Sequence, residues 1–234
     1  MKNPELALVI PVFNEEKVIK QVINKWLKVL KQINFKIIIV NDGSNDNTKK
    51  IIKSILTNKI ILLNKKNSGH GPTITYGYKA ALKLKPKFIF QVDSDNQFST
   101  GDFKKFWRKR QNYDFIIGHR LVRNDPLHRL VITRILKFFI ILFFGFSVKD
   151  INVPYRLMNF KVLKEGIKCI NPRNIVPNIL LSLFAFKKFK YKTEIIKHKK
   201  RKTGQVVLAN WNLIKFCIRA FYEVAMFRFF KFKL

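Results

Sequence analysis

In the first half of the sequence, short apolar segments alternate with segments of helical periodicity, and this alternation constrains the fold more than any other feature. Five apolar segments predict buried strands, at 6–13, 36–40, 59–63, 87–92 and 113–118. Helices are expected between them, at 15–32, 46–56, 72–84 and 102–110. Strands that alternate with helices form βαβ units and a mostly parallel sheet. We therefore expect an α/β, Rossmann-like fold in which helices flank the sheet.

Polar residues follow each of the first four apolar segments. These clusters are NEE at 14–16, NDGSND at 41–46, NKKNSGHG at 64–71 and DSDNQ at 93–97. In open parallel sheets, ligands bind beyond the carboxyl ends of the strands. We therefore expect the four clusters to meet at one edge of the sheet and to form a polar binding site.

The cluster at 93–97 holds Asp93 and Asp95, in a chain with 14 acidic and 47 basic residues. Two carboxylates at a strand end can converge on a hard cation such as Mg²⁺ or Mn²⁺, which also binds substrate phosphates. A solvated turn whose aspartates cap the next helix would show the same pattern. Asp42 can likewise accept hydrogen bonds from a nucleobase or ribose, with Gly43 permitting a sharp turn. A helix cap is the alternative there and at Glu15.

The sequence after residue 125 is apolar, aromatic and basic. Helices are expected at 127–148, at 174–189 and in the tail, and the segment 187–202 carries nine basic residues and one acidic residue. Apolar side chains interleaved with lysine and arginine are typical of helices that lie in the headgroup region of an anionic membrane. The longest uncharged stretch near the middle of the chain, 138–148, is shorter than the roughly 20 residues of a membrane-spanning helix. We expect a catalytic domain at 1–204 and an amphipathic membrane-interface helix at 205–234.

The formal net charge of +33 requires an explanation. An anionic partner, either nucleic acid or acidic lipid, would explain it, as would an AT-rich coding sequence. A nucleic-acid-binding function does not explain acidic clusters at successive strand ends, because carboxylates repel phosphates unless a metal lies between them. We therefore expect an anionic membrane surface as a partner and no nucleic acid. Two isolated cysteines, Cys169 and Cys217, fit a reducing compartment, so the expected location is the cytoplasm, at the inner face of the membrane.

The order of five motifs resembles that of a known enzyme family. VIPVFNEE, VNDGSND, NSGHGPTITYG, QVDSDNQ and IIGHR follow one another as they do in the inverting glycosyltransferases of the GT-A fold. The subgroup that looks most similar comprises dolichyl-phosphate mannose synthase and bacterial polyprenyl-phosphate glucosyltransferases. An ordered set of motifs is far more specific than any single one. The resemblance implies a GT-A fold and a metal-dependent hexosyltransferase.

The resemblance implies a role for each residue that matches the family's motifs. The residues expected to bind a nucleotide sugar, linked to UDP or GDP, are Pro11, Asn14, Glu15, Asp42, Gly69, Asp93 and Arg120. Mg²⁺ or Mn²⁺ is expected on Asp95 and Gln97, together with Asp93. Arg120 closes the motif IIGHR, in which His119 stands where the family has serine.

The expected acceptor is a polyprenyl phosphate, with a sugar hydroxyl of a glycan or lipopolysaccharide as the alternative. DINVPYR at 150–156 resembles a family segment that ends in GFR, and HKKRKTG at 198–204 matches a His-x-x-Arg-x-x-Gly element. The resemblance therefore implies that Arg120, Arg156 and Arg201 bind the acceptor phosphate. A hydroxyl acceptor would need a base, and Asp150 is the candidate that completes a catalytic set with Asp93 and Asp95. A small membrane protein is a further possible partner.

Overall fold

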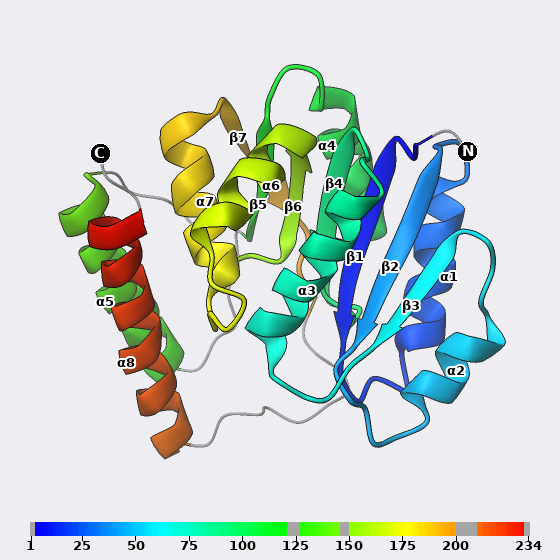
Figure 1. The fold of residues 1–234 in the computed structure, drawn as a ribbon, viewed down its shortest axis with the longest axis horizontal. Coiled ribbons are helices and arrows are strands. Elements are labelled where there is room, and N and C mark those ends of the chain that lie inside the picture. Colours follow the sequence, from blue (N-terminus) through cyan, green and yellow to red (C-terminus); the bar gives the residue numbers. More distant parts are fainter. Residues whose placement is uncertain (1–2, 121–126, 146–149, 200–209, 232–234) are drawn as a thin grey trace.

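The computed structural model describes residues 3–120, 127–145, 150–199 and 210–231, and its centre is a seven-stranded sheet with helices on both faces (Figure 1). The strands are β1 (Leu6–Val12), β2 (Phe35–Asn41), β3 (Ile60–Asn64), β4 (Phe88–Val92), β5 (Phe115–Arg120), β6 (Tyr155–Asn159) and β7 (Tyr191–Ile196). Their order is β3-β2-β1-β4-β6-β5-β7, and β6 is antiparallel to both of its neighbours. The other pairs are parallel, which confirms the expected α/β fold with a mostly parallel sheet.

The helices alternate with the strands along the first half of the chain. They are α1 (Ile19–Leu30), α2 (Thr48–Ser54), α3 (His70–Lys83), α4 (Phe103–Lys109), α5 (Leu127–Phe144), α6 (Phe160–Gly166), α7 (Pro177–Lys188) and α8 (Asn210–Met226). Short helical turns, η1 (Thr100–Asp102), η2 (Ile167–Cys169) and η3 (Phe227–Lys231), extend α4, α6 and α8. Helices α1, α2 and α4 lie on one face of the sheet, and α3, α6 and α7 lie on the other (Figure 1).

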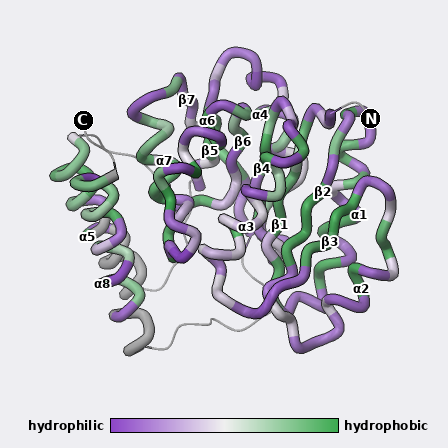
Figure 2. Tube along the Cα trace, in the orientation of Figure 1, coloured by the Kyte–Doolittle hydropathy of each residue, from purple (hydrophilic) through white to green (hydrophobic). Residues whose placement is uncertain are grey.

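The hydrophobic core follows from the apolar strands, which stand out in the middle of the molecule in Figure 2. Every residue of β1 is buried, as expected for a central strand that is covered on both faces. An aromatic cluster packs between the sheet and the helices α1 and α4, where Trp26 of α1 contacts Phe90 of β4 and Phe103 of α4. Tyr155 at the start of β6 packs against the same Phe90 ring, with ring centroids 4.8 Å apart. This cluster fixes α1, α4 and β6 around the end of β4.

Several elements of the structure differ from the sequence predictions. The first helix begins at Ile19 and not at residue 15, because residues 15–18 turn and contact the next loop. Two strands, β6 and β7, and the short helix α6 were not predicted, and β7 lies inside the basic segment 187–202. The predicted domain boundary at 204 falls outside the described residues.

Helices α5 and α8 lie side by side at the end of the molecule next to α7 (Figure 1). Ring contacts join them, among them Phe139 to Phe221 and Phe143 to Phe229. Among the helices that the structure describes, none has the length and hydropathy required to cross a bilayer.

Candidate functional site

The predicted polar clusters meet at one edge of the sheet. The parallel strands β1, β2, β4 and β5 all end there, and they deliver Glu15, Asp42, Asp93 and Arg120. Because β6 runs antiparallel, its first residue lies at the same edge, and the segment that precedes it brings Asp150. The strand order reverses between β1 and β4, which is the position where open α/β sheets bind ligands.

The loop after β1 is joined to the loop after β2. The backbone N–H of Asn14 donates to Ser44 Oγ at 3.0 Å, and the Asn14 side chain accepts from the Asn45 N–H at 2.9 Å. The N–H of Glu15 donates to Thr48 Oγ1 at 2.8 Å. Asn14 has a positive φ of 51°, which asparagine tolerates better than most residues. These contacts hold the two loops as one wall of the site.

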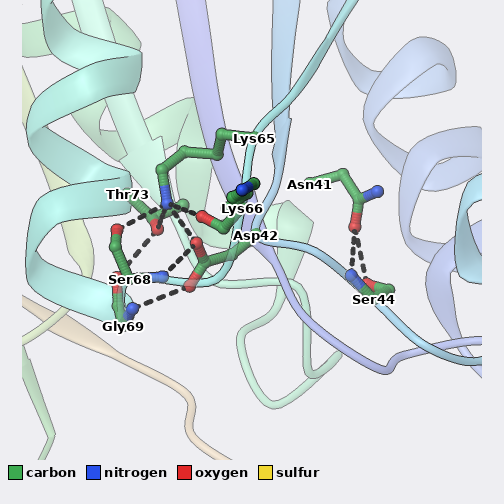
Figure 3. A network of polar contacts seen from close by, with 8 residues as sticks. All are labelled: Asn41, Asp42, Ser44, Lys65, Lys66, Ser68, Gly69 and Thr73. Carbon is green, nitrogen blue, oxygen red and sulfur yellow. Dashed lines mark hydrogen bonds and ion pairs between the residues drawn. The ribbon is translucent and has the colours of Figure 1, made fainter.

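Asp42 is the centre of the polar network drawn in Figure 3. Asp42 is 3% exposed, and its carboxylate accepts from the N–H groups of Ser68 and Gly69, both at 3.0 Å. Lys65 forms an ion pair with the same carboxylate and also donates to Thr73 Oγ1 at 3.3 Å. Asp42 therefore fastens the loop between β3 and α3 to the end of β2.

The loop geometry depends on two glycines. Gly43 has a φ of 69°, and a Cβ there would lie 2.8 Å from the backbone nitrogen of Asn67, so a larger residue would push the loop away. Gly69 has a φ of 90° and precedes α3. Its N–H reaches Asp42 because the backbone adopts a conformation that favours glycine.

Replacing Asp42 with asparagine is expected to loosen the β3–α3 loop and to weaken nucleotide binding at least about tenfold. An amide cannot accept from Ser68, Gly69 and Lys65 together, and leaving buried donors unpaired costs about 1–3 kcal/mol. Calorimetric titration with UDP and GDP, together with urea unfolding, measures both effects. Asp114→Asn is the control, because Asp114 accepts from Asn159 and Lys190 just before β5, at the opposite edge of the sheet. Equal loss of nucleotide binding in both variants would contradict a local role for Asp42.

Asp93 lies directly after β4 and is held by two side chains. Gln91 Nε2 donates to Asp93 Oδ1 at 3.2 Å, and His70 Nε2 lies 3.5 Å from the same oxygen. His70 is the first residue of α3, and its side chain is 56% exposed. Sequence reasoning assigned no role to His70. His70 belongs to the polar cluster at 64–71, which follows a predicted strand, and this position could have indicated that it lies in the site.

Asp95 and Gln97 lie in the turn that follows. The N–H of Gln97 donates to Asp95 Oδ1 at 3.1 Å, and Gln97 Nε2 donates to the carbonyl oxygen of Lys199 at 3.0 Å. Lys199 returns a bond from its N–H to the Gln97 carbonyl oxygen at 2.8 Å. The predicted metal-binding turn is therefore paired with the start of the His-x-x-Arg element.

The oxygen atoms of this turn suit a magnesium or manganese ion that takes some of its ligands from the protein and the others from a substrate. Within the described residues, no cluster of three histidine, cysteine or acidic side chains forms a complete metal cage. Asp93 and Asp95 are both half-buried at the strand end and provide carboxylate oxygens. Mg²⁺ is commonly bound through one or two carboxylates plus substrate phosphates, so two carboxylates suffice.

Arg120 and Asp150 form a bidentate ion pair at the same edge of the sheet. Arg120 Nε donates to Asp150 Oδ2 at 2.8 Å, and Nη2 donates to Oδ1 at 2.7 Å. The Asp150 side chain is 3% exposed, and its backbone has a φ of 123°, which is strained for any residue other than glycine. The structure thus pairs two residues that were predicted from separate motifs.

Arg156 does not lie where we predicted it. It is fully buried inside β6, and its guanidinium donates to the carbonyl oxygens of Val153 and Asn178 at 2.6 and 2.7 Å. It also donates to Ser182 Oγ at 3.1 Å. An acceptor phosphate cannot reach a guanidinium that is enclosed and already bonded, so the phosphate-binding prediction for Arg156 is corrected to a structural role.

The two remaining site residues predicted from the sequence are Pro11 and Arg201. Pro11 is buried within β1, paired in register with Val40. Arg201 lies outside the described residues. The phosphate-binding role of Arg201 therefore stays a prediction.

Comparison with known proteins identifies the family. Residues 7–167 match glycosyl transferase family 2, and the chain belongs to this family. It is 34% identical over 173 residues to the uncharacterized protein MJ0544 of Methanocaldococcus jannaschii, covering 68% of this chain and 74% of that protein. It is 30% identical over 194 residues to UDP-N-acetylglucosamine–dolichyl-phosphate N-acetylglucosaminyltransferase of Methanococcus voltae, covering 72% and 76%.

A solved structure supports the fold assignment. Glucosyl-3-phosphoglycerate synthase from Mycobacterium tuberculosis, in complex with Mn²⁺, UDP and glucosyl-3-phosphoglycerate, aligns with a TM-score of 0.67. The alignment covers 96% of this chain and 80% of that one, at 12% identity. The expected GT-A fold is therefore confirmed, and the protein is a glycosyltransferase.

Proposed function

We propose that this glycosyltransferase moves a hexose from a UDP- or GDP-linked donor to a polyprenyl phosphate, with inversion at the anomeric carbon, at a membrane surface. The observation that carries the acceptor assignment is the Arg120–Asp150 pair. Asp150 is the candidate base for a hydroxyl acceptor, yet both of its oxygens are bonded to Arg120 and its side chain is buried. A phosphate acceptor is already anionic near neutral pH and needs no base.

The relatives support the same acceptor class. The Methanococcus voltae relative is named as acting on dolichyl phosphate, and a relative from Proteus mirabilis, 25% identical over 191 residues, is named as an undecaprenyl-phosphate transferase. Both names describe lipid phosphates. This chain spans 57% of the Proteus relative, so that comparison supports the class of acceptor and not the sugar.

The residues at the sheet edge divide into donor and acceptor groups in this proposal. Asn14, Glu15 and Asp42 form the nucleoside side, and Asp93 binds the ribose. Arg120 contacts the donor diphosphate and balances the negative charge that develops as it leaves. A magnesium or manganese ion held by Asp95, Asp93 and Gln97 would supply further positive charge at the diphosphate.

The acceptor phosphate approaches from the side opposite the departing diphosphate, as inversion requires. The Arg120–Asp150 pair stays intact in this proposal, so Asp150 orients Arg120 toward the diphosphate and does not act as a base. Arg201 is proposed as a ligand of the acceptor phosphate, and Arg156 stabilises the segment next to Asp150 from inside the fold. The positions of Arg120, Asp150 and Arg156 support these roles, whereas the role of Arg201 rests on the match to the His-x-x-Arg-x-x-Gly element.

The test uses the full chain with labelled UDP-, GDP- and dTDP-sugars, Mg²⁺ or Mn²⁺, and two acceptors in parallel. We expect transfer to a short polyprenyl phosphate and no transfer to an oligosaccharide with free hydroxyl groups. The product should be a glycosyl phosphodiester with an anomeric configuration opposite to that of the donor, read by NMR. Transfer to the oligosaccharide alone would overturn the acceptor assignment and would restore Asp150 as a base.

A further inference from the structure

The end of the molecule formed by α5, α8 and η3 exposes an unusual amount of apolar surface. Among the described residues, twelve large hydrophobic side chains are exposed, and eight of them lie on these elements. The eight are Ile135, Phe138, Ile141, Leu142, Ile218, Tyr222, Phe229 and Phe230, with exposed fractions of 44–68%. We call this set the apolar end face. Exposed apolar patches of this kind mark interaction sites.

The apolar end face is exposed because the other sides of both helices are already occupied. Phe139 and Phe143 of α5 contact Phe221 of α8, and Ile140 and Phe144 are buried in the core. The exposed residues of α5 recur at helical spacing on the side that these contacts leave open. The face therefore belongs to a packed pair of helices and not to a loose tail.

The charge around the apolar end face is positive. Arg134 and Lys137 of α5 and Lys215 and Arg219 of α8 are exposed, and α5 contains no acidic residue. The one acidic residue of α8, Glu223, is buried. A face that combines large apolar side chains with cations and presents no carboxylate complements a bilayer with anionic headgroups.

The helices are tied rigidly to the catalytic domain. Glu223 accepts from the N–H groups of Ile175 at 2.9 Å and Val176 at 3.2 Å, immediately before α7. Arg219 donates to the Arg173 carbonyl oxygen at 2.8 Å, and Arg228 donates to the Phe143 carbonyl oxygen at 2.7 Å. Binding through the apolar end face therefore sets the orientation of the whole domain.

We propose that α5 and α8 together dock the protein onto an anionic lipid bilayer, with the apolar end face entering the headgroup region. Along the chain, α5 connects Arg120 at the end of β5 to Asp150. The docking helix therefore belongs to the part of the chain between the two residues of the Arg120–Asp150 pair. The sequence predicts that the C-terminal segment 205–234 alone contacts the membrane. In this proposal, both α5 and α8 do so. The benefit of docking for catalysis rests on the proposed lipid-phosphate acceptor. The docking itself is inferred from the exposed apolar and basic residues and does not depend on that acceptor.

The experiment measures sedimentation of the full chain with vesicles of phosphatidylcholine, with and without phosphatidylglycerol, in the absence of any substrate. Phe138→Ser with Leu142→Ser changes α5 only, and Ile218→Ser with Tyr222→Ser changes α8 only. Leu56→Ser with Tyr76→Ser removes apolar side chains of similar exposure, 45% each, elsewhere on the surface. Because all six side chains are exposed, circular dichroism is expected to be unchanged.

We expect both the α5 and the α8 variant to lower vesicle binding at least about tenfold, because each loses two interfacial side chains. The Leu56 and Tyr76 control should bind as the unmodified protein does, and binding should require phosphatidylglycerol. Loss in the α8 variant with full binding in the α5 variant would overturn the two-helix face. Binding to neutral vesicles alone, or a dimer in light scattering that ignores vesicles, would overturn the lipid assignment.

Failure of docking and failure of the proposed function give different results. A wrong acceptor assignment would leave vesicle binding intact while no sugar reaches polyprenyl phosphate. A wrong docking assignment would leave transfer to a short, water-soluble polyprenyl phosphate intact while the end-face variants bind vesicles normally.

Discussion

Replacing Asp95 with asparagine is expected to lower kcat/KM for sugar transfer by about 10²–10³, the range seen when a group that stabilises developing charge is removed. Asparagine keeps the shape of the side chain and can still accept the hydrogen bond from the Gln97 N–H. It removes the negative charge that a hard cation requires. Initial rates at saturating and limiting donor, with Mg²⁺ and with Mn²⁺, measure the loss.

The control for Asp95→Asn lies in the same turn. Asn96→Gly removes a side chain that contacts α1, through Gln21 at 2.8 Å and Lys25 at 3.0 Å, and glycine accepts its φ of 58°. This variant is expected to retain most of the activity. A second readout is Mn²⁺ affinity in the presence of UDP, followed by electron paramagnetic resonance. Unchanged Mn²⁺ affinity in Asp95→Asn would remove Asp95 from the metal site.

The position of the site was predictable because it depends on topology. Parallel strands place their carboxyl ends at one edge, so Asp42 and Asp93 had to approach each other once the alternation of strands and helices was recognised. The identity of the family followed from the order of the motifs. Neither inference requires any knowledge of side-chain packing.

The two missed strands show where periodicity fails. β6 carries a fully buried arginine at its second position, which interrupts the apolar pattern of a central strand. β7 reads YKTEII and is an edge strand with mostly exposed residues, so its composition indicates a basic surface segment. Both strands are stabilised by pairing with β5, a contact between distant parts of the chain that local sequence does not reveal.

Partners within the site were also beyond sequence reasoning. The sequence indicated that Asp42 and Asp150 carry chemistry, but not that Lys65 pairs with the first and Arg120 with the second. Such pairs depend on how loops from different strands are oriented. The pairing matters for function, because it decides which carboxylates are accessible before a substrate binds.

Arg156 lies at the centre of a buried polar network that links the two sides of the site. On one side, Gln91 donates to Asp93 and accepts from Asn178 Nδ2 at 3.3 Å. On the other, Arg156 donates to the Asn178 carbonyl oxygen and to the carbonyl oxygen of Val153, three residues after Asp150. Burial lowers the pKa of Arg156, whereas Tyr78, Asp93 and Asp150 act in the opposite direction. Arginine remains charged even so.

Arg156→Met is therefore expected to lower the free energy of unfolding by at least about 1–3 kcal/mol, the cost of leaving a buried acceptor without its donor. Methionine fills much of the volume but removes the donor to the Val153 carbonyl oxygen, and the Asn178 carbonyl oxygen keeps its bond from Ser182 Oγ. The segment that carries Asp150 should lose its position, so kcat should fall while the donor KM changes little. Urea unfolding and initial rates on the folded fraction measure the two effects.

Two control variants, Arg156→Lys and Arg110→Met, distinguish a positioning role of Arg156 from binding of the acceptor phosphate. Lysine restores the charge but not the fork of donors, so stability should recover only in part. Arg110 stacks on Trp107 at 4.2 Å on the outer side of the fold, and its loss should cost less than about 1 kcal/mol. If Arg156 bound the acceptor phosphate, Arg156→Met would instead raise the acceptor KM with little loss of stability. Loss of a donor that three buried acceptors share should lower the free energy of unfolding. An Arg156→Met protein as stable as the unmodified protein would therefore contradict a structural role for Arg156.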